Sequence, residues 1–241
     1  MQKMWTCCDR RLLRAVTKGA VYDMTYCISD LHGRDDRFRE MLEFIGFSAS
    51  DVLYIIGDVI DRNRGGVEIL RMIMKSPNMV LLKGNHEQMC LDAMTGPFNP
   101  EAEELWAFNG GGKTRRELAY HTSAAERGEI LRFLASLPEE LHLTVAGKNY
   151  ILVHAAPGET REERLWTRPE AFDWSRVPAD TLCIIGHTPT CFLTGDFNSV
   201  MRVYEGERYL CIDCGCGHNR PTCRPACLRL DDMAVFYGNR G

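Results

Sequence analysis

The sequence has no excess of positive charge and no long apolar run, and each absence excludes a class of partner. Its 29 Lys and Arg residues are outnumbered by 33 Asp and Glu, which gives a formal net charge of −4. No overall basic field therefore attracts a nucleic acid. No apolar stretch approaches the ~20 residues that a membrane helix needs. We expect neither a nucleic acid nor a membrane as partner.

The N-terminal residues lack the features of a signal peptide. They include basic side chains but no continuous apolar segment and no cleavage pattern. We expect residues 1–24 to form an N-terminal arm and residues 25–241 to form a single domain. Hydrophobic residues make up 45% of the 241 residues and charged residues 26%, which is typical of a soluble globular protein.

Cysteine is abundant, with 11 residues, and five of them lie between positions 211 and 227. An odd number of cysteines without a secretion signal favours reduced thiols and a cytoplasmic location. A structural zinc site remains an alternative, and its ligands would be Cys214, Cys216, Cys223 and Cys227. Because residues 218–227 contain no C-x-x-C pair, we favour free thiols.

Apolar periodicity predicts strands that alternate with helices in the first half of the chain. The expected strands are 25–30, 51–58 and 79–85, and the expected helices are 35–47, 65–76 and 86–94. This order predicts an α/β fold with a largely parallel sheet. On helix 65–76 the residues expected to face inward are Val67, Leu70, Ile73 and Met74.

The second half has a different pattern. A helical stretch over 100–137 is followed by a hairpin over 140–156, a short strand at 181–190, and hairpin candidates at 201–213 and 227–238.

Six expected strands end in Asp, Asn or His next to a glycine or another small residue. These polar residues are Asp30, His32, Asp58, Asn85, His86, His154, His187 and Asp213. Ligands of open α/β sheets bind outside the carboxyl ends of the strands, so we expect these side chains to converge. In isolation His154 is more typical of a buried core histidine, and Asp30 of a helix N-cap. Polar residues at all six strand ends are much less common if each arises independently for a structural reason.

The residue types indicate divalent metals. Carboxylates, an amide and imidazoles suit Mn, Fe or Zn. Two metals about 3.5–4 Å apart need a shared carboxylate, and Asp58 in the middle of the set is the natural candidate. Arg62 and Arg168 offer forked donors for phosphate oxygens.

The segment NGGGKT, residues 109–114, has the composition of a nucleotide-binding P-loop but not its spacing. Position 107 holds Ala where the motif needs Gly, and no strand precedes it. We interpret the segment as a tight turn near the site.

Five ordered blocks carry a resemblance to a known family. They are SDLHG (29–33), GDVIDRN (57–63), GNHE (84–87), VHAA (153–156) and GHTP (186–189). Together with LWTR (165–168) they resemble the PPP-family metallophosphatases, in particular the bacterial and phage serine/threonine phosphoprotein phosphatases. The resemblance extends from about residue 25 to 237. It differs at Ser29, Asn63 and Ala156, where glycine is common, and we expect Asn63 to tolerate a left-handed backbone there.

The resemblance implies a calcineurin-like β-sandwich flanked by helices, with a dinuclear metal site at the C-terminal strand ends. Its first metal would be held by Asp30, His32 and Asp58, and its second by Asp58, Asn85, His154 and His187. Manganese is the first expectation, with Fe or Zn as alternatives.

The resemblance also implies a reaction, in which a hydroxide that bridges the metals attacks phosphorus in line. Arg62 and Arg168 would bind the phosphoryl oxygens. His86 would protonate the leaving oxygen, Asp61 would orient His86, and Glu87 would brace the turn from behind.

The expected function is a metal-dependent serine/threonine protein phosphatase that acts, as a monomer, on phosphorylated protein or small phosphoesters. The first alternative is a dinucleoside polyphosphate hydrolase, such as one for diadenosine tetraphosphate. Those relatives typically have Asp where this chain has Glu87. The second alternative is a catalytically silent metal-binding interaction module, which would require a missing ligand.

Overall fold

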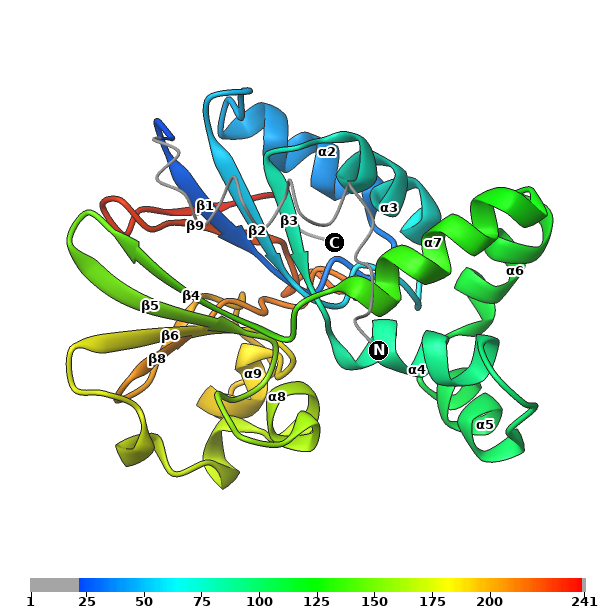
Figure 1. Cartoon of the computed structure of the whole chain (residues 1–241). Helices are drawn as coiled ribbons and strands as arrows, with labels where there is room; N and C mark the ends of the chain where they lie inside the picture. Colours follow the sequence, from blue (N-terminus) through cyan, green and yellow to red (C-terminus); the bar gives the residue numbers. More distant parts are fainter. Residues whose placement is uncertain (1–21, 240–241) are drawn as a thin grey trace, which may run out of the picture.

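The computed structural model describes residues 22–239, so most of the expected N-terminal arm lies outside the described residues. Two five-stranded sheets pack against each other, and helices cover their outer faces (Figure 1). The predicted α/β fold, a sandwich flanked by helices, is confirmed. No helix among the described residues is both long and apolar enough to cross a membrane.

The first sheet has the strand order β10-β9-β1-β2-β3. Its strands are β1 (Thr25–Ile28), β2 (Val52–Ile56), β3 (Met79–Leu82), β9 (Ala226–Arg229) and β10 (Val235–Tyr237). The second sheet has the order β4-β5-β6-β8-β7. Its strands are β4 (Glu140–Val145), β5 (Lys148–Val153), β6 (Thr181–Ile185), β7 (Tyr204–Glu205) and β8 (Tyr209–Cys211).

The helices fall into two groups. The first sheet is covered by α2 (Asp35–Phe44), α3 (Gly66–Lys75), α4 (Asn85–Met94), α5 (Pro100–Phe108), α6 (Gly112–Tyr120) and α7 (Ala124–Ser136). The second sheet is accompanied by the shorter helices α8 (Arg161–Trp166) and α9 (Thr190–Thr194) and by 3-10 turns at Pro169–Ala171 and Trp174–Arg176.

Strand β2 shows why these sequences form a sandwich. All five of its residues are buried, because alternate side chains enter different cores. Tyr54 and Ile56 pack between the two sheets, whereas Leu53 and Ile55 pack against the helices. Because both faces of the strand are buried, all of its side chains must be apolar. The strand therefore shows no alternation of apolar and polar residues.

The prediction of a largely parallel sheet is correct for β1, β2 and β3 and incomplete for the rest. These three strands pair in parallel, and β9 and β10 extend the same sheet in the antiparallel direction beside β1. In the second sheet β5, β6 and β8 are parallel. The carboxyl ends of six parallel strands thus meet at one end of the sandwich.

One inward-facing residue was predicted wrongly on α3. Val67, Leu70 and Ile73 are buried as expected, but Met74 is 37% exposed. Ile69, which was not expected to face inward, is buried. Because α3 contacts both the sheet and α6, its buried face is wider than a single stripe.

Candidate metal centre

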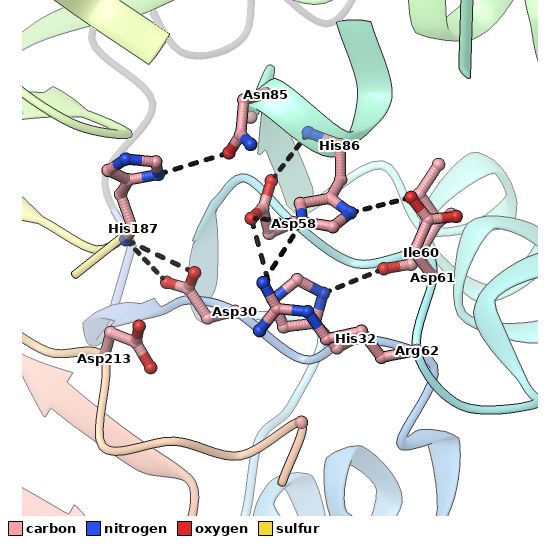
Figure 2. A network of polar contacts seen from close by, with 12 residues as sticks. Asp30, His32, Asp58, Ile60, Asp61, Arg62, Asn85, His86, His187 and Asp213 are labelled. Carbon is pink, nitrogen blue, oxygen red and sulfur yellow. Dashed lines mark hydrogen bonds and ion pairs between the residues drawn. The ribbon is translucent and has the colours of Figure 1, made fainter. Parts of the chain in front are cut away.

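The predicted site residues come together at the ends of the parallel strands. Asp30 and His32 follow β1, Asp58 follows β2, and Asn85 begins α4 directly after β3. From the second sheet, His154 follows β5 and His187 follows β6. Figure 2 shows most of these side chains arranged around Asp58. All are buried except His187, which is partly buried.

The backbone is strained where it presents these groups. Asp30, His32, Asp58 and His187 have φ values of 53°, 43°, 55° and 64°, in the left-handed region that side chains other than glycine rarely adopt. Each such residue costs on the order of 1–3 kcal/mol, and such strain is concentrated at functional sites. Backbone hydrogen bonds between the loops after β1 and β2 hold the conformation, for example His32 N–H to the Asp58 carbonyl at 2.9 Å.

Two glycines allow the strand ends to approach the carboxylates. A Cβ on Gly84 would collide with Oδ1 of Asp58, and a Cβ on Gly186 would collide with Oδ2 of Asp30 and with the side chain of Ser29. The absence of a side chain at Gly186 therefore makes room for the side chain of Ser29.

Asp58 lies between two groups of possible metal ligands. The first group is His32, Asp58 and His86, and the second is Asp30, Asp58 and His154. Oδ2 of Asp58 is 3.6 Å from Nε2 of His32, and Oδ1 is 3.4 Å from Nε2 of His154. One carboxylate is therefore within reach of both ligand sets, as a bridging ligand must be.

The histidines are oriented as metal ligands usually are. Nδ1 of His32 donates to the Ile60 carbonyl at 3.0 Å, and Nδ1 of His154 donates to the Ile56 carbonyl at 2.9 Å. These bonds fix the ring orientation and leave each Nε2 facing Asp58. The residues present therefore fit a divalent metal.

The two groups differ from the predicted sets, because Asp30 is grouped with His154 and not with His32. Asn85 and His187 lie beside His154. Oδ1 of Asn85 lies 2.9 Å from Nε2 of His154 and 3.2 Å from Nδ1 of His187. Nε2 of His187 donates to the Trp166 carbonyl at 3.1 Å, which directs Nδ1 inward. The predicted set of Asp58, Asn85, His154 and His187 is thus brought together.

His86 forms a buried pair with Asp61. Nδ1 of His86 lies 2.7 Å from Oδ2 of Asp61, and the same oxygen accepts a bond from Nε1 of Trp106 at 2.8 Å. The backbone N–H of Asp61 donates to Oγ1 of Thr114 at 2.8 Å. Nε2 of His86 points toward Asp58, with Oδ2 at 3.8 Å.

The two arginines occupy different positions. Nη2 of Arg62 is 3.3 Å from Nε2 of His86, so its guanidinium lies inside the site. Arg168 is exposed at the rim, 5.5 Å from the ring centre of Phe192. Its charge contributes to a lowered pKa of His187, after the larger effects of burial and of His154.

The sequence that carries these side chains matches a known family over most of the chain. Residues 25–195 match the calcineurin-like phosphoesterase family. The chain is a calcineurin-like phosphoesterase.

The curated relatives fall into two groups with different names. The phosphoesterase is 33% identical over 144 residues to a symmetrical bis(5'-nucleosyl)-tetraphosphatase of Acidovorax sp. (strain JS42), covering 58% of this chain and 47% of the relative. It is 31% identical over 131 residues to serine/threonine-protein phosphatase 1 of Salmonella typhimurium, covering 54% of this chain and 57% of the relative. The matched region thus spans about half the length of each relative.

Solved structures share the fold. One is a protein serine/threonine phosphatase from Saccharomyces cerevisiae similar to human phosphatase PP5, with a TM-score of 0.62, 12% identity, and coverage of 97% of this chain and 87% of that chain. Another is a cold-active protein-tyrosine phosphatase of a Shewanella species, with a TM-score of 0.54, 15% identity, and coverage of 90% and 80%.

The turn formed by NGGGKT lies beside the site, as predicted. Gly110 accepts a bond from the Arg62 backbone N–H at 3.2 Å, and Thr114 binds Asp61. Helix α5 precedes the turn and α6 begins at Gly112, so a P-loop is excluded. The contacts by which Trp106 and Thr114 hold Asp61 were not predicted from the sequence.

Glu87 braces the turn, as predicted. Its carboxylate accepts hydrogen bonds from the backbone N–H groups of Asp58 at 2.8 Å, Val59 at 2.9 Å and Gly84 at 2.9 Å. It therefore ties the loop after β2 to the start of α4.

Asn63 does not adopt the left-handed backbone that we expected it to tolerate. The left-handed residues of this turn are Asp61 and Arg62, and Asn63 is not among them. Its side-chain amide instead donates to the carbonyls of His32 at 3.0 Å and Gly217 at 2.7 Å. The departure from glycine thus adds a link between two loops of the site.

The cysteine segment does not form a ligand group. Cys216 and Cys227 belong to the core beneath the helices, whereas Cys214 and Cys223 pack in a separate apolar cluster. Among residues 22–239, neither group of possible metal ligands contains a cysteine. The interpretation as free thiols is favoured over the zinc site.

Metal binding should release protons. Burial lowers the pKa of His154, but the charges of Asp58 and Asp30 outweigh that effect and raise it to about 10. Metal-free His154 is therefore protonated at pH 7, and a metal must displace that proton from the imidazole.

We expect release of about one proton per chain from His154 when Mn²⁺ binds, and an affinity for Mn²⁺ that rises with pH up to about 10. Calorimetry in buffers of different ionisation enthalpy measures this; affinity independent of pH would contradict it.

Proposed function

We propose that this phosphoesterase is a phosphomonoesterase of the serine/threonine protein phosphatase type, which uses two divalent cations and acts as a monomer. Mn²⁺ is the proposed metal, with Fe or Zn as alternatives. The observation that carries the proposal is the buried His86–Asp61 pair next to Asp58. A proton donor held in this position serves a substrate whose leaving group is a poor one, such as the alkoxide of serine.

The metals, when bound, would lower the pKa of water and neutralise charge on the phosphoryl group. The chain's own residues do the rest. Asp58 belongs to both groups of possible ligands and so links them. Arg62 follows β2 of the first sheet, and Arg168 follows α8 beside the second sheet. Each would donate hydrogen bonds to phosphoryl oxygens. These bonds would fix the position of the ester bond relative to His86.

His86 would transfer a proton to the leaving oxygen from Nε2. Its Nδ1 is bound to Asp61, which fixes the ring orientation. Trp106 and Thr114 hold Asp61 in place. Asp61 therefore acts through His86, as a positioning residue.

A dinucleoside tetraphosphate is the second candidate substrate, because one group of curated relatives carries that name, including one that is 33% identical. Glu87 belongs to the block GNHE, whose resemblance to the protein phosphatases favours the phosphatase instead.

A direct comparison tests the proposal. The Mn²⁺-loaded protein is assayed with a phosphoserine peptide and with diadenosine tetraphosphate under identical conditions. We expect kcat/KM to be higher for the peptide by at least about tenfold, equivalent to about 1.4 kcal/mol of transition-state binding. The reverse order would assign the tetraphosphatase function, and hydrolysis of neither would reject both.

Arg168→Ala should weaken substrate binding without loss of metal. A charge-assisted hydrogen bond contributes about 1.5–3 kcal/mol, so kcat/KM for the peptide should fall by about 10- to 100-fold. Metal content is measured on the same sample, and Arg116→Ala, an exposed residue on α6, is the matched control. Full activity, or loss of metal together with activity, would exclude Arg168 from phosphate binding.

A further inference from the structure

Two phenylalanines lie exposed on the surface next to Arg168. Phe192, on α9, is 53% exposed, and Phe197 is 50% exposed. Their rings form an edge-to-face pair with centres 5.2 Å apart at 86°. The guanidinium of Arg168 lies over the Phe192 ring, 5.5 Å from its centre. Exposed phenyl rings contribute little to the fold by burial, so the stability of the fold does not account for this pair.

The aromatic surface formed by Phe192 and Phe197 lies on and just after a helix that follows a residue of the metal centre in the chain. Helix α9 begins at Thr190, three residues after His187. The Trp166 ring meets the His187 ring edge-on, with centres 6.1 Å apart, and the Trp166 carbonyl accepts from that histidine. Figure 1 shows α8 and α9 next to each other below the strand ends. A phosphoryl group held by Arg168 would therefore have Phe192 as its neighbour.

We propose that Phe192 and Phe197 bind a planar aromatic ring carried by the leaving group of the substrate. The inference rests on the proposed function, because it assigns a partner to the leaving group of the same reaction. A phenyl face beside a guanidinium binds another aromatic ring better than an aliphatic chain, since stacking and cation–π attraction add to the loss of exposed apolar surface. Under the proposed function the ring is an aromatic side chain of the phosphorylated peptide. A nucleobase presents the same flat surface and is the alternative that the hydrolysis test distinguishes.

Binding of phosphonates tests the surface without requiring hydrolysis. The ligands are ethylphosphonate, 2-cyclohexylethylphosphonate and 2-phenylethylphosphonate, measured by calorimetry on the Mn²⁺-loaded protein. We expect the phenyl compound to bind about 10-fold more tightly than the ethyl compound and more tightly than the cyclohexyl compound. Phe192→Ala should reduce the phenyl-to-ethyl ratio to about twofold or less, whereas affinity for ethylphosphonate stays unchanged within about twofold.

A matched variant shows whether the preference for a phenyl ring belongs to this surface. Phe98→Ala removes a phenylalanine that is 81% exposed on a different part of the protein and should leave the phenyl-to-ethyl ratio unchanged. If Phe192→Ala weakens all three phosphonates equally, Phe192 only supports Arg168 and the aromatic surface is rejected. A phenyl-to-ethyl ratio near one in the unmodified protein rejects it as well.

Hydrolysis then identifies the source of the ring. Phe192→Ala is assayed with diadenosine tetraphosphate and with a phosphoserine peptide that has a neighbouring phenylalanine. A larger fall in kcat/KM for the first indicates a nucleobase, and a larger fall for the second indicates a peptide side chain. Unchanged kcat/KM for both would overturn the inference. Failure of the unmodified protein to hydrolyse either substrate would reject the proposed function, while the phosphonate ratio still decides the aromatic surface.

Discussion

Replacing His86 with Asn is expected to lower kcat/KM for a phosphoserine peptide by about 10²–10⁴-fold and to lower that for p-nitrophenyl phosphate far less. The serine alkoxide is a very poor leaving group and needs a proton, whereas nitrophenolate departs almost unaided. Because His86 is held by Asp61 with its Nε2 toward the centre of the site, its loss should affect the proton and leave the metals in place.

The control for this variant comes from its neighbours. Asp61→Asn should show the same substrate dependence more weakly, because Asp61 acts only through the ring of His86. Metal content is measured for both variants. The structure also groups His86 with His32 and Asp58 as a possible ligand set. If His86 is a metal ligand, hydrolysis of both substrates should fall equally and in step with metal content, and the proton-donor role would be wrong.

Asp58→Asn is expected to remove both metal and activity. Asp58 is the one residue shared by the two groups of possible ligands, and an amide lacks the charge that holds two cations together. Loss of several kcal/mol of charge stabilisation corresponds to a fall in kcat of at least roughly 10³-fold. Metal analysis and phosphatase assays on the same preparation measure the two effects.

A matched substitution shows whether the effect belongs to the site. Asp180→Asn alters an exposed carboxylate just before β6 and should retain metal and activity. Circular dichroism checks that Asp58→Asn is folded, since Asp58 also accepts a bond from the His86 backbone N–H at 3.1 Å. A folded Asp58→Asn protein that keeps two metals would exclude the bridging role.

Most of the site could be predicted from the sequence because of where its residues lie along the chain. Asp30, Asp58 and His154 each follow a strand whose final residues are buried, and parallel strands end at the same edge. Local apolar runs therefore placed the candidate ligands without any knowledge of long-range contacts. The ordered blocks around them carried the family resemblance.

The features that were missed depend on contacts between distant segments. The pairing of β9 with β1 joins residues that are about 200 positions apart, and no local pattern indicates its direction. Met74 was expected inside because periodicity cannot tell how wide the buried face of α3 is. Trp106 and Thr114 contact Asp61 across 45 and 53 positions, so their role becomes visible only once α5 and α6 are placed.

The central claim is that the buried Asp and His residues around Asp58 hold two cations on which hydrolysis depends. The most direct test is a titration of metal-stripped protein with Mn²⁺, in which bound metal and hydrolysis of the phosphoserine peptide are measured at each step. We expect no activity in the stripped protein and full activity at about two ions per chain. Hydrolysis at the full rate without metal, or saturation at one ion per chain, would contradict the account.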